Sequence, residues 1–160
     1  MATIVPFIPV SRIPGLTTTT IRDFTTEDWA AFSTDQLVAL TTAQAAVISS
    51  DGLAALGTAQ LRAFETQDLR SIATGSLRAL TSDKIGALST DQWAALSTNQ
   101  VAALLTDQLK GLTTADVVAL TSAQIAALRS DQVASLNTDQ LRAIETGDLK
   151  AMTTADIRAL

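Results

Sequence analysis

The side chains that could do chemistry here are hydroxyls, carboxylates and a few basic groups, because the chain contains no His and no Cys. Imidazole base catalysis, thiol catalysis and the usual zinc ligands are therefore missing. Ser and Thr are abundant, but only carboxylates and Lys remain to activate them, and these stand in no catalytic arrangement. We predict that the chain is not an enzyme and holds neither a cofactor nor a metal ion.

Basic side chains form the clearest candidate binding feature. They recur at intervals of eight residues in two groups of three, so two rows of positive charge would form if these positions point outward. Such rows would suit a polymer with carboxylate or sulfate groups. The simpler interpretation is that they maintain solubility and complement the helix dipole. The residues are Arg62, Arg70, Arg78, Arg142, Lys150 and Arg158.

An eight-residue repeat sets the elements that must position these side chains. From Leu16 to Leu160 every eighth residue is large and apolar, without insertion or deletion, which gives eighteen units over residues 17–160. We number each unit from one to eight so that this apolar residue is position eight. Uniform arrays of this kind are typical of repeat proteins, which extend in one dimension.

Each position of the unit has its own preference. Position two is Ser or Thr in all eighteen units, position five is large and apolar in seventeen, with Ala45 as the exception, and position seven is small in sixteen. Position four is Gln in nine units, and position six carries the basic residues named above. A hydroxyl is a good N-cap, and an acidic residue after it meets the positive end of the helix dipole. The unit therefore predicts a short helix with its N-cap at position two.

Two other backbones fit the repeat poorly. In one continuous helix, each unit would overshoot two turns by about 80°, so the apolar stripe would circle the helix. In a strand, positions five and eight would lie on opposite faces. We expect an all-α solenoid with one helix of about five to seven residues per unit, because helices this short are stable only when stacked. The expected core is narrow and rich in Leu, with corners at positions one and two and two or three helices per coil.

The two ends of the chain differ in sequence. Residues 1–16 contain all three Pro and match the repeat only at Leu16, so they predict an irregular N-terminal cap, and residues 17–160 predict one solenoid. Residues 137–160 are ordinary repeat units without a polar cap that would cover the apolar end of the core. We therefore expect either that the array is longer or that this end associates with another copy. A block of three units, residues 57–80, also resembles residues 137–160, ten units later.

Individual residues have simple interpretations beside functional ones. Trp29 and Trp93 occupy position five, which favours a place in the core. Asp and Gln at positions three and four are expected to be solvated helix N-terminal residues rather than calcium ligands. The regular Thr residues at position two could match an ice lattice, but capping would occupy their hydroxyls.

Charge and hydropathy limit the partners. The formal net charge is −5, which argues against nucleic acid and against an anionic membrane surface. No apolar stretch is long enough for a membrane span. No N-terminal signal peptide is evident, because Pro6 and Pro9 interrupt the apolar N-terminal stretch and no basic segment precedes it.

Several units are similar to a known octapeptide. STDQLVAL (33–40), TTADVVAL (113–120) and TSAQIAAL (121–128) resemble a repeat found in long tracts of large, poorly characterised bacterial proteins. Some of these proteins are described as adhesion or haem-utilisation proteins, mostly by inference. The resemblance implies a bacterial, surface-exposed repeat protein and transfers no site residues. The lack of His gives the haem description no support here.

These observations lead to three hypotheses for function. The first is a structural repeat, either a spacer or stalk or a self-assembling scaffold, within a larger bacterial surface or secreted protein. The second is a solenoid that binds a peptide or a polysaccharide. The third is an ice-binding protein. An extracellular or cell-surface location is favoured.

Overall fold

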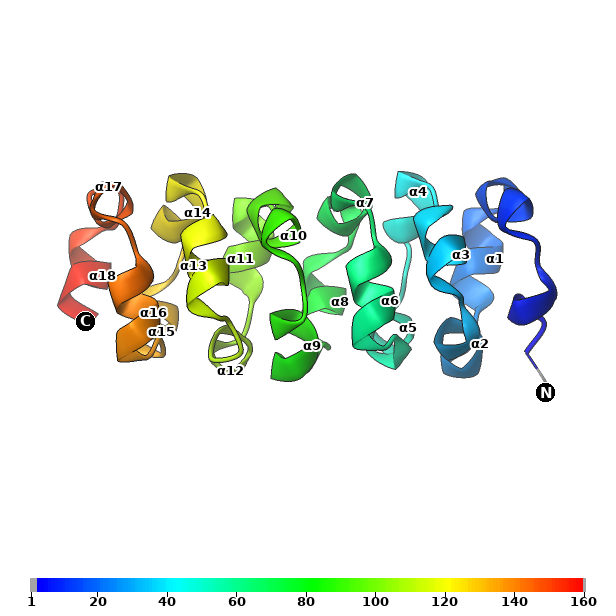
Figure 1. Cartoon of the computed structure of the whole chain (residues 1–160), viewed down its shortest axis with the longest axis horizontal. Helices are drawn as coiled ribbons and strands as arrows, with labels where there is room; N and C mark the ends of the chain where they lie inside the picture. The colour runs from blue at the N-terminus through cyan, green and yellow to red at the C-terminus, as the bar shows by residue number, and fades with distance from the viewer. Residues whose placement is uncertain (1–2, 160) are drawn as a thin grey trace.

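The structure, a computed structural model, describes residues 3–159 as a rod built entirely of short helices. Two 3₁₀ helices precede eighteen α-helices, and no strand occurs within this range. The N-terminal and C-terminal helices lie at opposite ends of the rod (Figure 1). None of the helices in the described range is long and apolar enough to cross a membrane.

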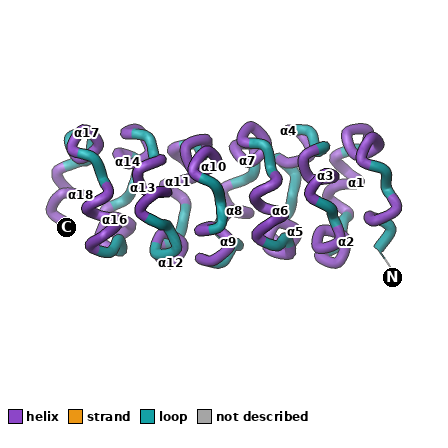
Figure 2. Tube along the Cα trace, in the orientation of Figure 1, coloured by secondary structure: helices purple, strands orange, loops and turns teal. Residues whose placement is uncertain are grey.

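The bounds of the helices follow the repeat throughout the described residues. They are η1 Val5–Phe7, η2 Val10–Gly15, α1 Thr18–Asp23, α2 Thr26–Ala31, α3 Thr34–Val38, α4 Thr42–Ala45, α5 Ser50–Ala55, α6 Thr58–Ala63, α7 Thr66–Ser71, α8 Thr74–Leu77, α9 Ser82–Gly86, α10 Thr90–Ala95, α11 Thr98–Ala103, α12 Thr106–Leu109, α13 Thr114–Ala119, α14 Ser122–Ala126, α15 Ser130–Ala134, α16 Thr138–Ala143, α17 Thr146–Leu149 and α18 Thr154–Ala159. Figure 2 shows how short loops join them along the rod.

The all-α solenoid with one helix per unit is therefore confirmed. Helix lengths mostly agree with the expected five to seven residues, as in α2 with six and α3 with five, whereas α4 has four. Each begins at position two of its unit. The residues at positions eight and one are extended, as at Phe32 and Ser33, so the corner lies there rather than at positions one and two.

The N-cap is position one, and its prediction at position two was wrong by one residue. The Ser33 Oγ accepts from the Gln36 backbone N–H at 3.2 Å, and the Gln36 Oε1 accepts from the Ser33 N–H at 2.9 Å. This reciprocal pair is a capping box, which requires the hydroxyl and the amide to stand three residues apart. The frequent Gln at position four therefore places the cap at position one.

Helices stack on those three units away. α2 packs on α5, α4 on α7 and α10 on α13. Hydrogen bonds also join units four apart, as from Gln100 to Leu69 and Ile72. A unit that touches its neighbours at both separations belongs to a coil with between three and four helices per turn. The stacking of helices three units apart agrees with the upper value of the expected two or three helices per coil, and the hydrogen bonds across four units make the coil slightly larger.

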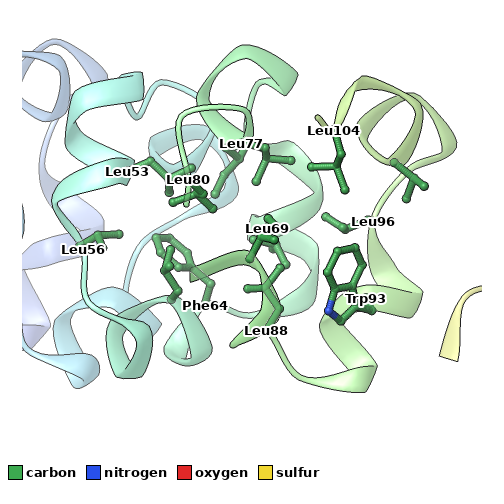
Figure 3. Close-up of a cluster of buried hydrophobic side chains, with 14 of the residues drawn as sticks. Leu53, Leu56, Phe64, Leu69, Leu77, Leu80, Leu88, Trp93, Leu96 and Leu104 are labelled. Carbon is green, nitrogen blue, oxygen red and sulfur yellow. The ribbon is translucent and has the colours of Figure 1, made fainter. Parts of the chain in front are cut away.

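Positions five and eight line one continuous core. Side chains such as Leu53, Leu69 and Leu77 from position five meet Leu56 and Leu80 from position eight along the axis (Figure 3). Full burial of such a side chain contributes about 1.5–3 kcal/mol. The prediction for this core is confirmed over most of the described residues. Ile157, at position five of the last unit, is 44% exposed, and Leu160 lies outside the described range.

Both Trp residues lie in this core, as predicted. Trp29 and Trp93 have no exposed surface. Trp29 stacks on Phe32 with ring centroids 4.9 Å apart, and Phe24 meets both rings edge-on. An aromatic cluster therefore fills the core near the N-terminal end of the rod.

Small residues let stacked helices approach closely. A Cβ at Gly86 in α9 would collide with the backbone carbonyl of Gly111, which lies two residues after the end of α12. A Cβ at Gly111 would lie 2.5 Å from the Ser82 carbonyl oxygen. These two helices therefore touch backbone to backbone.

The described part of the N-terminal segment also follows the repeat. The Gln36 Nε2 donates to the Val5 and Ile8 carbonyls at 2.9 and 2.8 Å. The Gln44 Nε2 donates in the same way to Ile13 and Leu16, at 2.7 and 2.8 Å. Val5 and Ile13 are fully buried at the equivalents of position five. These residues thus form two further units in 3₁₀ form, with Pro6 and Pro14 inside the helices. Residues 1 and 2 lie outside the described range.

Candidate functional site

Buried glutamines form the most regular polar feature of the rod. Each of the nine Gln residues at position four makes the same three hydrogen bonds. In the unit of Gln100, the Oε1 accepts from the Ser97 N–H at 2.8 Å, and the Nε2 donates to the Leu69 and Ile72 carbonyls at 3.0 and 2.8 Å. We call this set the glutamine ladder: Gln36, Gln44, Gln60, Gln92, Gln100, Gln108, Gln124, Gln132 and Gln140.

The expectation that position four is solvated was wrong. Eight members of the ladder are buried, and Gln60 is half-buried. A planar amide offers one acceptor and two donors, so it pairs backbone groups that two different helix ends leave unsatisfied. Burial is favourable because every polar atom of the amide has a partner. The ladder therefore stabilises the stacking of units and leaves no free polar group to offer a ligand.

Aspartates replace Gln at position four in a second pattern. The Thr42 hydroxyl donates to the Asp68 Oδ1 at 2.7 Å, and the Ser122 hydroxyl donates to the Asp148 Oδ1. Both bonds run from position two of one unit to position four of the unit three further on. In both units position one is Glu, at Glu65 and Glu145, so the capping hydroxyl is missing. These carboxylates thus bridge stacked helices.

Asp68 is electrostatically unusual. Its side chain is only 1% exposed, and its Oδ2 finds no hydrogen-bond partner among the described residues. Burial raises the pKa of the Asp68 carboxyl, the hydrogen bond from Thr42 lowers it in part, and the negative charge of Glu65 raises it further. The site is a buried acid with one unused oxygen, which favours the protonated form.

A lysine also takes the place of Gln. The Lys84 Nζ donates to the Ala54 carbonyl, which lies in the unit four before its own. Sequence reasoning missed this contact, because an isolated Lys at position four gives no sign that it points inward. The repeat register supplies the signal once position four is known to donate to the earlier unit.

The hydroxyls of position two are not caps. Thr34, Thr58, Thr114 and Thr138 are exposed first residues of their helices. Among the described residues, Thr42 and Ser122 use this hydroxyl to reach an Asp of a stacked helix. The argument against ice binding was that capping occupies these hydroxyls. Because position two is not the N-cap, that argument does not hold.

The six basic residues are all exposed at position six. Consecutive helices lie at successive corners of the coil (Figure 1), so the units that carry Arg62, Arg70 and Arg78 are distributed around the rod. α6 faces the viewer, α7 lies along one edge and α8 lies behind. The structure therefore does not bring the three consecutive residues of a group together. Binding of an anionic polymer by these residues stays a prediction. In the structure, the basic residues of three consecutive units do not share a face, in contrast to the rows expected from the sequence.

Two ion pairs involve other residues of the outer surface. Within residues 3–159, the ion pairs join Lys110 to Asp107 at 2.7 Å and Arg129 to Asp131 at 3.0 Å. Each lowers the pKa of its Asp, mainly through the hydrogen bond from the cation. The described residues contain no group of three or more His, Cys, Asp or Glu that would hold a metal ion.

Comparison with known families agrees with this geometry. Residues 61–98 and 111–143 match the family described as the ALTTAQ repeat, whereas no curated protein sequence matches the chain. The letters ALTTAQ occur at residues 39–44, and ALTSAQ occurs at 119–124. Each of these six-residue strings covers positions seven and eight of one unit and positions one to four of the next. Its last residue is therefore the ladder glutamine. Residues 61–98 and 111–143 are thus similar to the ALTTAQ repeat family.

Proposed function

We propose that the chain is a stiff structural repeat that acts as a spacer, a stalk or a self-assembling scaffold in a larger bacterial surface or secreted protein. The glutamine ladder is the observation that carries this proposal. Each ladder residue ties its own unit to a unit four earlier, across one turn of the coil. The hydrogen bonds of successive ladder residues lie on different sides of the rod.

Stiffness follows from this arrangement. Bending the rod must open the stack on its convex side. Opening would expose apolar side chains of positions five and eight and break hydrogen bonds of the ladder. Because helices surround the axis on all sides, resistance to bending has no weak direction (Figure 2). A solenoid with such nearest-neighbour contacts extends by adding units and keeps its width.

The length per unit gives a direct test by small-angle X-ray scattering. A variant with a second copy of residues 57–136 inserted in register gains ten units, which correspond to three stacking steps. Packed helices lie about 8–10 Å apart, so the rod should lengthen by roughly 24–30 Å with an unchanged cross-section. A larger cross-section, or scattering typical of a flexible chain, would contradict the proposal.

Binding of a peptide or polysaccharide is the second candidate function. It is favoured by one observation, the pattern of residues at the outward-facing position six. A spacer needs only a soluble exterior, whereas the repeated pattern described below is more specific. Saturable binding of a defined polymer would separate the two functions.

A further inference from the structure

The outward-facing position six repeats after ten units. Over residues 33–80 it reads Val, Ala, Ala and three basic residues, and over residues 113–160 it reads the same. Core packing does not impose the Val and Arg residues of this pattern, because Val38, Val118, Arg62 and Arg142 are exposed. The residues are Val38, Ala46, Ala54, Arg62, Arg70 and Arg78, and then Val118, Ala126, Ala134, Arg142, Lys150 and Arg158.

Ten units return to the same face of the rod. α3 packs on α6, Gln92 of α10 donates to the Leu61 and Phe64 carbonyls of the α6 unit, α10 packs on α13, and α13 packs on α16. Figure 1 shows α3, α6, α13 and α16 all turned toward the viewer along the rod. We call the surface formed by these four helices the repeated face.

Each half of the repeated face presents the same groups at position six. Val38 is 46% exposed on α3, and Val118 is 53% exposed on α13, which is unusual for large apolar side chains of this molecule. The stacked helices α6 and α16 present Arg62 and Arg142, and neither enters an ion pair with a described residue. Each pair of stacked helices thus presents one exposed apolar side chain and one guanidinium.

Exposed hydroxyls complete each half. Position two lies four residues before position six, so both project from the same side of a helix. Thr34 and Thr58 therefore accompany Val38 and Arg62, and Thr114 and Thr138 accompany the second pair. All four Thr residues are exposed.

We propose that the repeated face binds a linear acidic polysaccharide. A guanidinium pairs with a sugar carboxylate in bidentate geometry, the Thr hydroxyls bond sugar hydroxyls, and Val packs against the apolar face of a sugar ring. A bound peptide normally uses a sheet edge or an apolar groove, whereas this face offers single valines among hydroxyls. The proposal does not depend on the rod being a spacer.

The two halves make binding bivalent. They are separated by three stacking steps, or roughly 24–30 Å. A long polymer can bind both halves at once, and the second contact then benefits from a high effective concentration. A short oligosaccharide reaches only one half. Binding strength should therefore increase with polymer length.

The test measures binding of polygalacturonate, a linear polymer of uronic acid, to the full chain by isothermal titration calorimetry. The double variant R62Q/R142Q should bind about tenfold more weakly. The matched control is R70Q/K150Q, which removes two charges from the same repeat position but in the units of α7 and α17, away from the repeated face. It should change the affinity less than about twofold. Gln at an exposed helix position keeps the fold, which circular dichroism verifies.

Further measurements with other variants and with dextran and poly-glutamate complete the design. R62Q alone should weaken binding of the long polymer but leave binding of a galacturonate trisaccharide largely intact through the second half. V38S/V118S should weaken binding of both, and neutral dextran should not bind. Absence of saturable binding to polygalacturonate, equal losses in the two double variants, or equal binding of poly-glutamate would each overturn the proposal.

Discussion

The Thr42 hydroxyl donates a hydrogen bond to the Asp68 Oδ1 at 2.7 Å across two stacked helices. The other carboxylate oxygen is buried, with no partner among the described residues. In units with Gln at position four, the corresponding amide donates to carbonyls of a unit four earlier. A protonated Asp68 has a donor on its carboxyl group, as Gln does, but an ionised Asp68 has none.

Asp68→Asn should therefore raise thermal stability at neutral pH. The pKa of Asp68 is higher in the folded chain than in the unfolded chain, so the folded state binds the proton more readily. The stability from this proton is present below the unfolded pKa of about 3.9 and is lost as the pH rises through the folded pKa. Thermal unfolding from pH 3.5 to 7.5 should show a smaller loss of stability for Asp68→Asn than for the parent chain.

The charged residues around Asp68 are few. Glu65 and Arg70 lie in its own unit, the packed helix α10 contributes Asp91, and the packed helix α4 contributes none. Asp51→Asn, at an exposed position three, is the matched control and should leave the pH dependence unchanged. If both variants shift the pH dependence equally, the effect comes from net charge and not from burial of Asp68.

Loss of one ladder residue should be costly. Gln100→Ala leaves the Ser97 N–H and the Ile72 carbonyl without this partner in the interior, and each unpaired buried group costs about 1–3 kcal/mol. The free energy of unfolding, measured in urea, should fall by roughly 2–4 kcal/mol. Asn99→Ala, at the exposed neighbouring position, should change it by less than about 0.5 kcal/mol.

Gln100→Glu separates the two roles of the ladder amide. The carboxylate still accepts from the Ser97 N–H but cannot donate to the Leu69 and Ile72 carbonyls. We expect it to destabilise the chain at neutral pH and to recover stability on acidification, when the protonated group donates once more. A loss of stability that does not change with pH would show that acceptance at Ser97 dominates.

The cap register is testable with neighbouring threonines. Thr113→Ala removes the hydroxyl that accepts from the Asp116 N–H at 3.2 Å and should cost about 1 kcal/mol. Thr114→Ala changes the first residue of α13, where Ala is a good helix former, and should be close to neutral. Thermal unfolding of the two variants compares them directly, and the reverse order would restore the cap to position two.

The close approach of α9 and α12 predicts opposite effects for two glycines. Gly86→Ala forces the new methyl group against the Gly111 carbonyl and should destabilise the chain by about 1–3 kcal/mol. Gly75→Ala, in the first turn of α8, meets no neighbouring atom within 4 Å. It should stabilise the chain by about 0.5–1 kcal/mol through helix propensity. Similar losses for both variants would contradict the backbone contact.

The fold was predictable because two properties of the repeat, its internal spacing and its length, each exclude an alternative backbone structure. The spacing of three between positions five and eight, as at Leu37 and Leu40, excludes a strand, and the length of eight excludes one continuous helix. The cap register was missed because positions one and two are both rich in hydroxyls. The spacing of Ser33 and Gln36 is a capping-box signal that would have resolved it.

Other features were beyond the sequence for physical reasons. Burial of Gln100 depends on carbonyls that only stacking brings near, so composition suggests a solvated residue instead. The direction of Arg62 relative to Arg70 depends on the angle between successive units, which is a tertiary property. In the N-terminal segment, Val5 and Ile13 keep the spacing of the repeat, but Pro and the absence of hydroxyl caps hide it.

The direction of the ladder bonds has a consequence for biosynthesis. The donor Gln always belongs to the later unit and the accepting carbonyls to an earlier one, 28 and 31 residues before it, as for Gln124 with Leu96 and Trp93. A ribosome therefore releases the acceptors first, and each emerging unit carries the group that fastens it to structure already made. The stretch of chain between donor and acceptor is equally short for every ladder residue. The solenoid can therefore fold during translation, from the amino terminus onward.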